Sequence, residues 1–199
     1  MTRPQAKIVS ASDKGLAVCA ASARLSTTQG SALEILKEGG DGDKDRSLIA
    51  KVMAYGHKSL IEHHVFSIAF DNVSVLTEQF LIEFRMASFT VKSRRYVDFS
   101  QAGYYTPAAL QGALRDKYES AVAALFDAYG RLLDLGIPRE DARFVLPYCF
   151  LSNLYMTVNA RELVHIISAM RFGRGAGNEE LESLGAQLTD QFETYYPGL

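Results

Sequence analysis

The chain has 199 residues, of which 48% are hydrophobic and 22% charged, and its formal net charge is -2. This length suits one domain with a substantial core, and the composition excludes long disordered tracts. The charge gives no reason to expect a nucleic-acid polymer or a membrane surface as partner, so any anion site must be local. No apolar run approaches the roughly 18 residues of a membrane span, and the N-terminus lacks the apolar core of a signal peptide. We therefore expect a single domain over residues 1–199 in a soluble, cytoplasmic protein.

The first third of the chain alternates strand and helix patterns. We expect a strand at residues 7–10, helices at 14–23, 33–37 and 46–55, and a loop at 39–45. The loop is indicated by its glycines, which permit positive φ, and by its aspartates, which compete for backbone hydrogen bonds.

The middle of the chain begins with alternating apolar and polar residues at 64–71, rich in β-formers. This pattern predicts a half-buried strand that Asn72 would close. A helix at 75–86, a polar loop at 87–95 and a further strand at 96–100 are expected to follow.

Helical spacing dominates the second half. We predict helices at 107–135, at 139–170 with a break near Pro147, and at 178–195. The expected class is therefore α/β (α+β), a helix-rich single domain with few strands, whose sheet is expected to need a neighbouring subunit to complete its core.

Several common catalytic signatures are missing from the sequence. There is no Gly-rich phosphate loop after a strand, no nucleophile elbow and no CxxC motif. Cys19 and Cys149 lie in apolar surroundings without metal-ligand spacing, which favours buried, reduced thiols.

The first polar cluster is the segment SFTVKSRRY at residues 88–96, which concentrates Lys92, Arg94 and Arg95 among hydroxyl side chains. Guanidinium groups donate in a planar fork and hydroxyls fill the remaining acceptor sites of a phosphate. The segment thus suits phosphate binding, with a solvated surface loop as the alternative.

The second cluster places five polar residues within eight positions: His57, Ser59, Glu62, His63 and His64. Zinc is disfavoured, because the cluster lacks a His pair at i, i+4 with a third ligand and has no cysteine nearby. We therefore expect no metal. The alternative is structural, with Ser59 capping a short helix and Glu62 and a histidine making local hydrogen bonds.

The third cluster lies in residues 158–171, where Arg161 and His165 are four positions apart and share one face of the predicted helix. Arg143 belongs to the preceding helical segment. Arginines in a cleft need anionic partners, because they cannot lose their proton. These partners are either a ligand or nearby carboxylates, for which the candidates are Glu162, Glu179 and Glu180.

Taken in order, the three clusters resemble the flavin-dependent thymidylate synthases, whose chains carry GHxSxxEH, then RHRxxSxxxxSxRY, then an LP…NAR helix. This chain has GHKSLIEH at 56–63, EFRMASFTVKSRRY at 83–96 and LPYCFLSNLYMTVNAR at 146–161. Three ordered matches at family-like separations are far more specific than any one alone.

The resemblance implies two sets of binding residues. Those at the flavin would be Ser26, His57, Ser59, Glu62, Arg85, Asn159, Arg161 and His165. Those at the nucleotide would be Gln79, Lys92, Ser93, Arg94, Arg95, Arg143 and Arg171. Of these, Arg95 and Arg171 would also act in catalysis by polarising the pyrimidine.

The resemblance further implies a homotetramer with sites shared between subunits. The expected reaction is methylation at C5 of the uracil ring of dUMP or UMP. Methylenetetrahydrofolate would supply the carbon, reduced FAD the hydride and NADPH the reducing equivalents, and no enzymic nucleophile is required. The alternative is a catalytically reduced homologue that binds nucleotide as a sensor or structural subunit.

Five departures from the family pattern accompany these matches. Glu83 and Phe84 replace an arginine and a histidine, which would place a carboxylate against flavin phosphates unless the flavin or the segment has shifted. Residues 90–92 read Thr-Val-Lys where the family has Asn-Glu-x, which alters the contacts expected near the sugar. Gln79 and Arg171 each stand one position from the expected place, and the family's AQxE segment is AGNE here.

Overall fold

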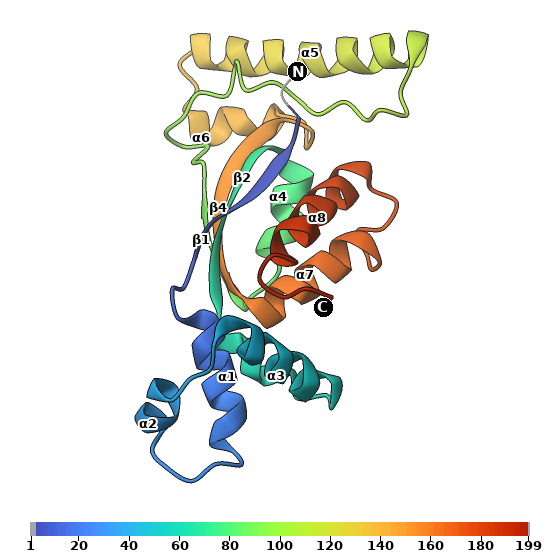
Figure 1. The fold of residues 1–199 in the computed structure, drawn as a ribbon. Coiled ribbons are helices and arrows are strands. Elements are labelled where there is room, and N and C mark those ends of the chain that lie inside the picture. The colour runs from blue at the N-terminus through green and yellow to red at the C-terminus, as the bar shows by residue number, and fades with distance from the viewer. Residues whose placement is uncertain (1–2, 199) are drawn as a thin grey trace.

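The computed structural model describes residues 3–198 and has at its centre a four-stranded antiparallel sheet in the order β1-β2-β4-β3 (Figure 1). The strands are β1 (Gln5–Ala11), β2 (Val65–Ser74), β3 (Ala87–Val91) and β4 (Leu151–Asn159). The combination of helices with an antiparallel sheet confirms the expected α+β class.

Alternation along the two central strands decides which face of the sheet is covered. Phe66, Ile68 and Phe70 of β2 and Leu154 and Met156 of β4 are buried, with exposed fractions no higher than 3%. Successive side chains point to opposite faces of a strand, so these residues form one apolar layer. Their neighbours lie on the other face, where Val65 and Tyr155 remain 39% and 60% exposed. One face of the sheet is therefore covered and the other is open.

The helices gather in three places, as Figure 1 shows. The covered face carries α4 (Val75–Ile82), α7 (Ala160–Arg171) and α8 (Glu179–Phe192). One end of the sheet carries α1 (Gly15–Leu25), α2 (Ala32–Lys37), α3 (Gly42–Ala54) and the 3₁₀ helix η1 (Lys58–His63). The opposite end carries α5 (Gly112–Asp134), α6 (Arg139–Ala142) and the 3₁₀ helix η2 (Arg143–Val145).

Polar side chains set the starts of five of these helices. The caps that accept a backbone hydrogen bond are Ser31 for α2, Asp41 for α3, Ser74 for α4, Asn159 for α7 and Asn178 for α8. Each satisfies a backbone N–H that has no partner within the helix. Two of the caps, Ser74 and Asn159, come directly at the end of a central strand. They fix where the chain turns from the sheet into the helices that carry the candidate site.

The outer edge of β1 is covered by two glutamines of α8. The backbone N–H groups of Ala6 and Ile8 donate to Gln187 Oε1 at 2.9 Å and to Gln191 Oε1 at 2.8 Å. Gln191 Nε2 in turn donates to the carbonyl of Ala6 at 2.8 Å. The first strand is thus tied both to its neighbour β2 and to the C-terminal helix. Within residues 3–198, no helix is both long and apolar enough to cross a membrane.

The predicted helix over 139–170 is wrong, because it contains the central strand β4. Within that range only residues 139–142 and 160–170 are α-helical. The segment LSNLYMTVN has its buried residues at alternate positions, which is a strand period. Its leucines and methionine also favour helices, and the helical spacing that follows Asn159 extended the prediction too far.

The predicted loop over 87–95 is also partly wrong, since residues 87–91 form β3. The hydroxyl groups of Ser88 and Thr90 are exposed, while Ala87, Phe89 and Val91 are half-buried, as expected for an edge strand. The strand predicted at 96–100 is instead turn and bend.

Two smaller boundaries differ as well. The predicted loop over 39–45 is shorter than expected, because Asp41 caps α3 and residues 42–45 form its first turn. Asn72 does not close β2; it adopts a φ of 53° at a bulge, and the strand continues to Ser74. Asparagine tolerates this left-handed conformation better than most residues, and its N–H donates to Asn153 Oδ1 at 2.8 Å.

Candidate functional site

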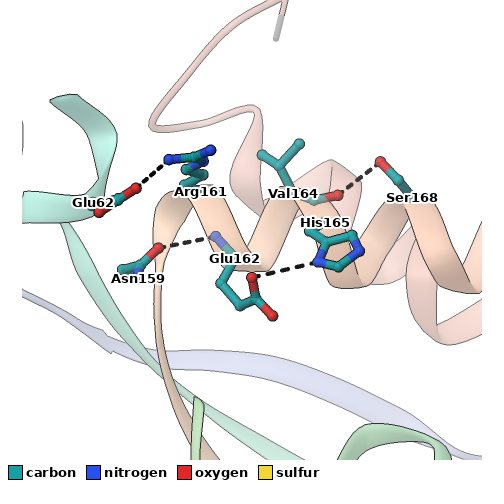
Figure 2. A network of polar contacts seen from close by, with 7 residues as sticks. All are labelled: Glu62, Asn159, Arg161, Glu162, Val164, His165 and Ser168. Atoms are coloured by element: carbon teal, nitrogen blue, oxygen red, sulfur yellow. Dashed lines mark hydrogen bonds and ion pairs between the residues drawn. The ribbon is translucent and has the colours of Figure 1, made fainter. Parts of the chain in front are cut away.

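The second and third sequence clusters meet where η1 packs against the start of α7 (Figure 2). Arg161 Nη1 donates to Glu62 Oε1 at 2.5 Å, across 99 positions of sequence. Both side chains are about half exposed, at 52% and 41%. An ion pair this exposed contributes little to stability. Its arginine therefore retains donors that face solvent and are available to a ligand.

The first turn of α7 carries the other members of this cluster. Asn159 Oδ1 accepts from the N–H of Glu162 at 2.9 Å, and Glu162 Oε2 lies 3.4 Å from His165 Nδ1 (Figure 2). His165 is 65% exposed. Arg161 and His165 thus lie one turn apart on one face of α7, within its first two turns. We call Glu62, Asn159, Arg161, Glu162 and His165 the α7 cluster.

The altered triplet Glu83-Phe84-Arg85 lies beside this cluster, at the end of α4. The ring of Phe84 is 5.4 Å from that of His165, edge to face. Glu83 makes an ion pair with Arg174, in the turn between α7 and α8. The carboxylate at position 83 therefore has a cation of its own. Arg85 is exposed in the turn between α4 and β3.

Three other residues were expected at the flavin, and of these His57 and Ser59 lie on η1 beside the cluster, whereas Ser26 lies at the far end of α1. Ser26 ends α1 and donates to the carbonyl of Ala23 at 3.3 Å, and it is exposed. His57 and Ser59 lie at the start of η1 and are exposed as well. Ser59 is inside η1 and His57 occupies the cap position, so the expectation that Ser59 caps this helix is wrong. Glu62 bonds a distant arginine, so its expected local hydrogen bond is also wrong.

His64, the next residue after η1, belongs to the core. It is 3% exposed, and its Nδ1 lies 2.8 Å from the hydroxyl of Tyr196, across 132 positions of sequence. Burial lowers its pKa from 6.5 to about 4. The same hydroxyl lies 3.7 Å from Cys19 Sγ, and burial raises the pKa of this thiol. His64 is therefore a neutral structural side chain at pH 7.

The stability of the fold is expected to decrease in mild acid because of His64. Its pKa is lower in the folded than in the unfolded state, so its contribution is complete above pH 6.5 and is lost as the pH falls through 4. Between pH 7 and pH 5 the loss should be about 2 kcal/mol. Urea unfolding of wild type and of His64→Gln at both pH values measures it, with the exposed His63→Gln as control. Equal losses in wild type and His64→Gln would contradict the assignment.

The first sequence cluster forms a second group, between β3 and α4. Arg94 Nη2 donates to Glu78 Oε1 at 2.5 Å, and the guanidinium lies over the ring of Phe150 at 5.2 Å. Gln79 Nε2 is 3.5 Å from the same carboxylate oxygen. Glu78 is 1% exposed. Arg94 is thus anchored to a buried acid, with only 20% of its side chain exposed.

Arg95 and Arg143 both contact Glu140, a residue of α6. Arg95 Nη2 lies 2.7 Å from Glu140 Oε2, and Arg143 Nε donates to the carbonyl of Glu140 at 2.8 Å. Arg95 is 59% exposed. Two cations from segments about 50 positions apart therefore share one surface. We call Arg94, Arg95, Arg143 and Glu140, with Gln79, the β3–α6 cluster.

The remaining expected nucleotide residues divide into two groups. Lys92 and Ser93 belong to the loop after β3, where Lys92 Nζ is 5.7 Å from the ring of Phe99 and Ser93 Oγ accepts from the N–H of Arg95 at 3.3 Å. Arg171 lies elsewhere, at the end of α7, where its Nη1 donates to Thr189 of α8 at 2.9 Å. Ser93 thus contacts the β3–α6 cluster through Arg95, Lys92 precedes it in the same loop, and Arg171 lies apart from them.

The two clusters lie toward opposite ends of β3. This strand pairs with β4 from Ala87 opposite Val158 to Val91 opposite Leu154. Helix α7 follows β4 at the Ala87 end, whereas the loop with Arg94 and Arg95 leaves from the Val91 end. Five residues of strand span about 14 Å. One chain alone therefore keeps the two clusters apart, as the distance between α6 and the start of α7 in Figure 1 illustrates.

A cavity of about 610 Å³ opens at a third place, between the segment at Tyr104 and Tyr105 and helix α8. Its lining includes Glu179, Ser183 and Gln187 and none of the residues expected at flavin or nucleotide. Burial raises the pKa of Tyr105 to about 12, so its phenol stays protonated. Among residues 3–198 no group of three or more His, Cys, Asp or Glu side chains is placed to hold a metal ion.

The acidic partners of the expected cations were missed from sequence. Of the carboxylates suggested beforehand, Glu162 does meet His165, but Glu179 and Glu180 bind elsewhere. The actual partners of Arg161, Arg94 and Arg95 are Glu62, Glu78 and Glu140, which stand 99, 16 and 45 positions away by the numbering of the pairs. Such long-range pairs leave no spacing signal in a single sequence.

Comparison with known proteins places this arrangement in context. A family model described as thymidylate synthase complementing protein matches residues 7–198. A flavin-dependent thymidylate synthase of Geobacter sulfurreducens is 38% identical over 125 residues, covering 60% of this chain and 53% of that protein. Another from Saccharolobus solfataricus is 27% identical over 195 residues, covering 97% of this chain and 74% of that protein. The chain thus spans about half the length of the Geobacter relative.

A solved structure is similar over nearly the whole fold. It is the crystal structure of a UMP/dUMP methylase, PolB, from Streptomyces cacaoi bound with 5-Br dUMP. The two chains are 29% identical with a TM-score of 0.83, and the match covers 98% of this chain and 92% of the other. The length and the fold of the two proteins therefore correspond closely.

Proposed function

Because the chain belongs to the thymidylate synthase complementing protein family, we propose that it methylates C5 of the uracil ring of dUMP or UMP in a flavin-dependent, reductive reaction. Methylenetetrahydrofolate is the carbon donor and NADPH the reductant. The observation that carries the proposal is the folding of the three motifs into two cationic clusters at opposite ends of β3. Two clusters match the need for one flavin and one nucleotide site.

The α7 cluster has the chemistry to hold FAD. The flavin diphosphate is an anion, and the exposed side chains of Arg161 and His165 offer it donors near the N-terminus of α7, whose dipole also favours negative charge. Arg85 adds a further exposed cation from the neighbouring turn, and His57 and Ser59 add exposed polar groups from η1. Ser26, at the far end of α1, is also assigned to the flavin. When bound, the reduced flavin supplies the hydride. The residues of the chain hold and orient it.

The β3–α6 cluster is assigned to the nucleotide. Arg95 and Arg143 offer guanidinium donors to its phosphate, and Ser93 offers a hydroxyl. A cation beside a pyrimidine carbonyl also stabilises negative charge that develops on the ring, which makes C5 more nucleophilic. Arg171 is assigned the same polarising role from a neighbouring subunit, since in its own chain it lies apart from this cluster.

The thiols of the chain support a reaction without an enzymic nucleophile. Burial raises the pKa of Cys19 and of Cys149, so both are thiols rather than thiolates at pH 7. Neither is a member of the α7 cluster or the β3–α6 cluster. Activation of the ring is therefore left to the cations.

A homotetramer with shared sites completes the proposal. The two clusters lie about 14 Å apart along β3 in one chain, so a nucleotide and a flavin in contact are best supplied by different subunits. The open face of the sheet, with Val65 39% and Tyr155 60% exposed, offers a surface for that association.

Use of UMP as well as dUMP is supported by two features. This chain and the Streptomyces UMP/dUMP methylase correspond over 98% and 92% of their lengths, a closer match in length than with the longer synthases. The segment before Ser93, at the end of β3, carries Thr90, Val91 and Lys92 in place of the acidic pattern of the synthases. UMP carries ribose, so its methylation gives a product other than thymidylate. We therefore assign the protein a role in making a specialised nucleotide.

The test is an anaerobic assay of purified protein with FAD, methylenetetrahydrofolate, NADPH and either nucleotide. Methylated product from UMP and dUMP is the expected result, together with flavin absorbance that bleaches on reduction. Product from dUMP alone would restrict the protein to thymidylate synthesis. Nucleotide binding without flavin or product would overturn the proposal and favour a catalytically reduced homologue that acts as a sensor.

A further inference from the structure

Arg174 makes four contacts with residues at the end of α4. It makes an ion pair with Glu83, its Nη2 donates to the carbonyl of Phe80 at 3.2 Å, and its guanidinium lies over two rings. The distances to the ring centroids are 4.4 Å for Phe80 and 5.2 Å for Phe84. We call Glu83, Phe80, Phe84 and Arg174 the α4 clasp. It joins α4 to the turn between α7 and α8.

The ion pair alone would not fix this arginine. The side chains of Arg174 and Glu83 are 48% and 60% exposed, and pairs in that range contribute little. Stacking on aromatic faces and a backbone acceptor add directional contacts that a planar guanidinium can make at the same time. Arginine is thus suited to this place in a way that lysine is not.

The ring of Phe84 connects the α4 clasp to the α7 cluster. Phe84 is 7% exposed, packs against Phe80 at 5.6 Å between centroids, and presents an edge contact to His165 at 5.4 Å. His165 is otherwise 65% exposed and bonded only weakly, at 3.4 Å, to Glu162. Phe84 is therefore the buried contact that can set the orientation of this imidazole.

We propose that Arg174 is a positioning residue of the α7 cluster: held by Glu83, it fixes Phe84 and through Phe84 the ring of His165. The carboxylate at position 83 then serves to orient Arg174 and does not oppose an anionic cofactor. The inference rests on the proposed function for its link to FAD. Its geometric part, the control of His165 by Arg174, is independent of any ligand.

The geometric part is tested on the protein without ligand, by NMR of the histidine ring protons. The four histidines give a small set of signals, and the His165 signal is identified by its loss in His165→Asn. Arg174→Ala is expected to move or broaden the His165 signal while the signal of buried His64 stays in place. Arg115→Ala, which breaks a 2.8 Å ion pair of similar exposure on α5, is the matched control and should move neither.

The functional part is tested by titration with FAD. Arg174→Ala is expected to weaken FAD binding about tenfold, Arg174→Lys less, and Glu83→Gln least, because stacking and the Phe80 carbonyl still hold the arginine. The exchange Glu83→Arg with Arg174→Glu should not restore binding, since it places a carboxylate over the rings. Unchanged FAD affinity in Arg174→Ala, or an unmoved His165 signal, overturns the inference. If wild type binds no FAD, the proposed function fails, and the His165 signal alone decides whether the clasp exists.

Discussion

Replacement of Arg95 by alanine is expected to weaken the binding of dUMP and UMP by about 3 kcal/mol, or more than 100-fold. Arg95 is 59% exposed and its partner Glu140 is 44% exposed, so the pair is readily exchanged for a ligand. A nucleotide phosphate bound between Arg95 and Arg143 would be largely desolvated, and charge-assisted hydrogen bonds to it would be costly to lose. Calorimetric titration with each nucleotide measures the effect.

The matched control for Arg95 is its acidic partner. Glu140→Gln removes the competing carboxylate but keeps the backbone carbonyl that accepts from Arg143 at 2.8 Å. Nucleotide affinity in this variant should stay the same or rise. Equal affinity in Arg95→Ala and wild type would move the phosphate site away from the β3–α6 cluster.

Loss of Glu180 is expected to lower the free energy of unfolding by about 3 kcal/mol. The residue is 3% exposed, and its carboxylate accepts from the backbone N–H of Ser74 at 2.7 Å and from its hydroxyl at 2.5 Å. Burial raises the pKa of Glu180, while the two bonds from Ser74 act in the opposite direction. Glu180→Ala would leave two buried donors unsatisfied at the point where β2 becomes α4.

The effect of Glu180 should extend to the site, because Ser74 also caps the helix that carries Glu78 and Gln79. Urea unfolding compares Glu180→Ala with Asp190→Ala, which removes an exposed acid from the same helix. Asp190→Ala should be close to wild type. Similar stability of the two variants would show that the buried carboxylate is not needed to start α4.

The parts of the fold that could be predicted from sequence are those with one dominant period. The strand predicted at 64–71 corresponds to β2, whose buried side chains alternate over residues 65–71, and the helices near 14–23, 33–37 and 178–195 were found to within a few residues. β4 was missed because its alternation lies directly next to the helical spacing of α7. A strand at the centre of a sheet is stabilised by its two neighbours, which a single-sequence window does not contain.

The candidate site, like the fold, could be predicted only in part from the sequence. The residues named from the motifs lie close together in sequence, and Arg161 and His165 share one face of α7 because their spacing of four positions dictates it. What the sequence could not supply is the acid that each arginine meets. Glu62 with Arg161 and Glu83 with Arg174 are brought together by the packing of separate elements. The carboxylate at position 83 looked repulsive only as long as its partner was unknown.

The two glutamines of α8 along β1 bear on how copies of this chain can associate. The unpaired backbone groups of an exposed edge strand can pair with a strand of another molecule, and repeated pairing of this kind builds a fibre. At Ala6 and Ile8 the outward amide groups are already bonded by Gln187 and Gln191, so growth by strand addition is blocked there. Association through the open face of the sheet stops at a fixed number of subunits, because a closed symmetric assembly leaves no copy of this interface exposed. A helix that ties down the N-terminal strand thereby also favours a finite assembly over a fibre.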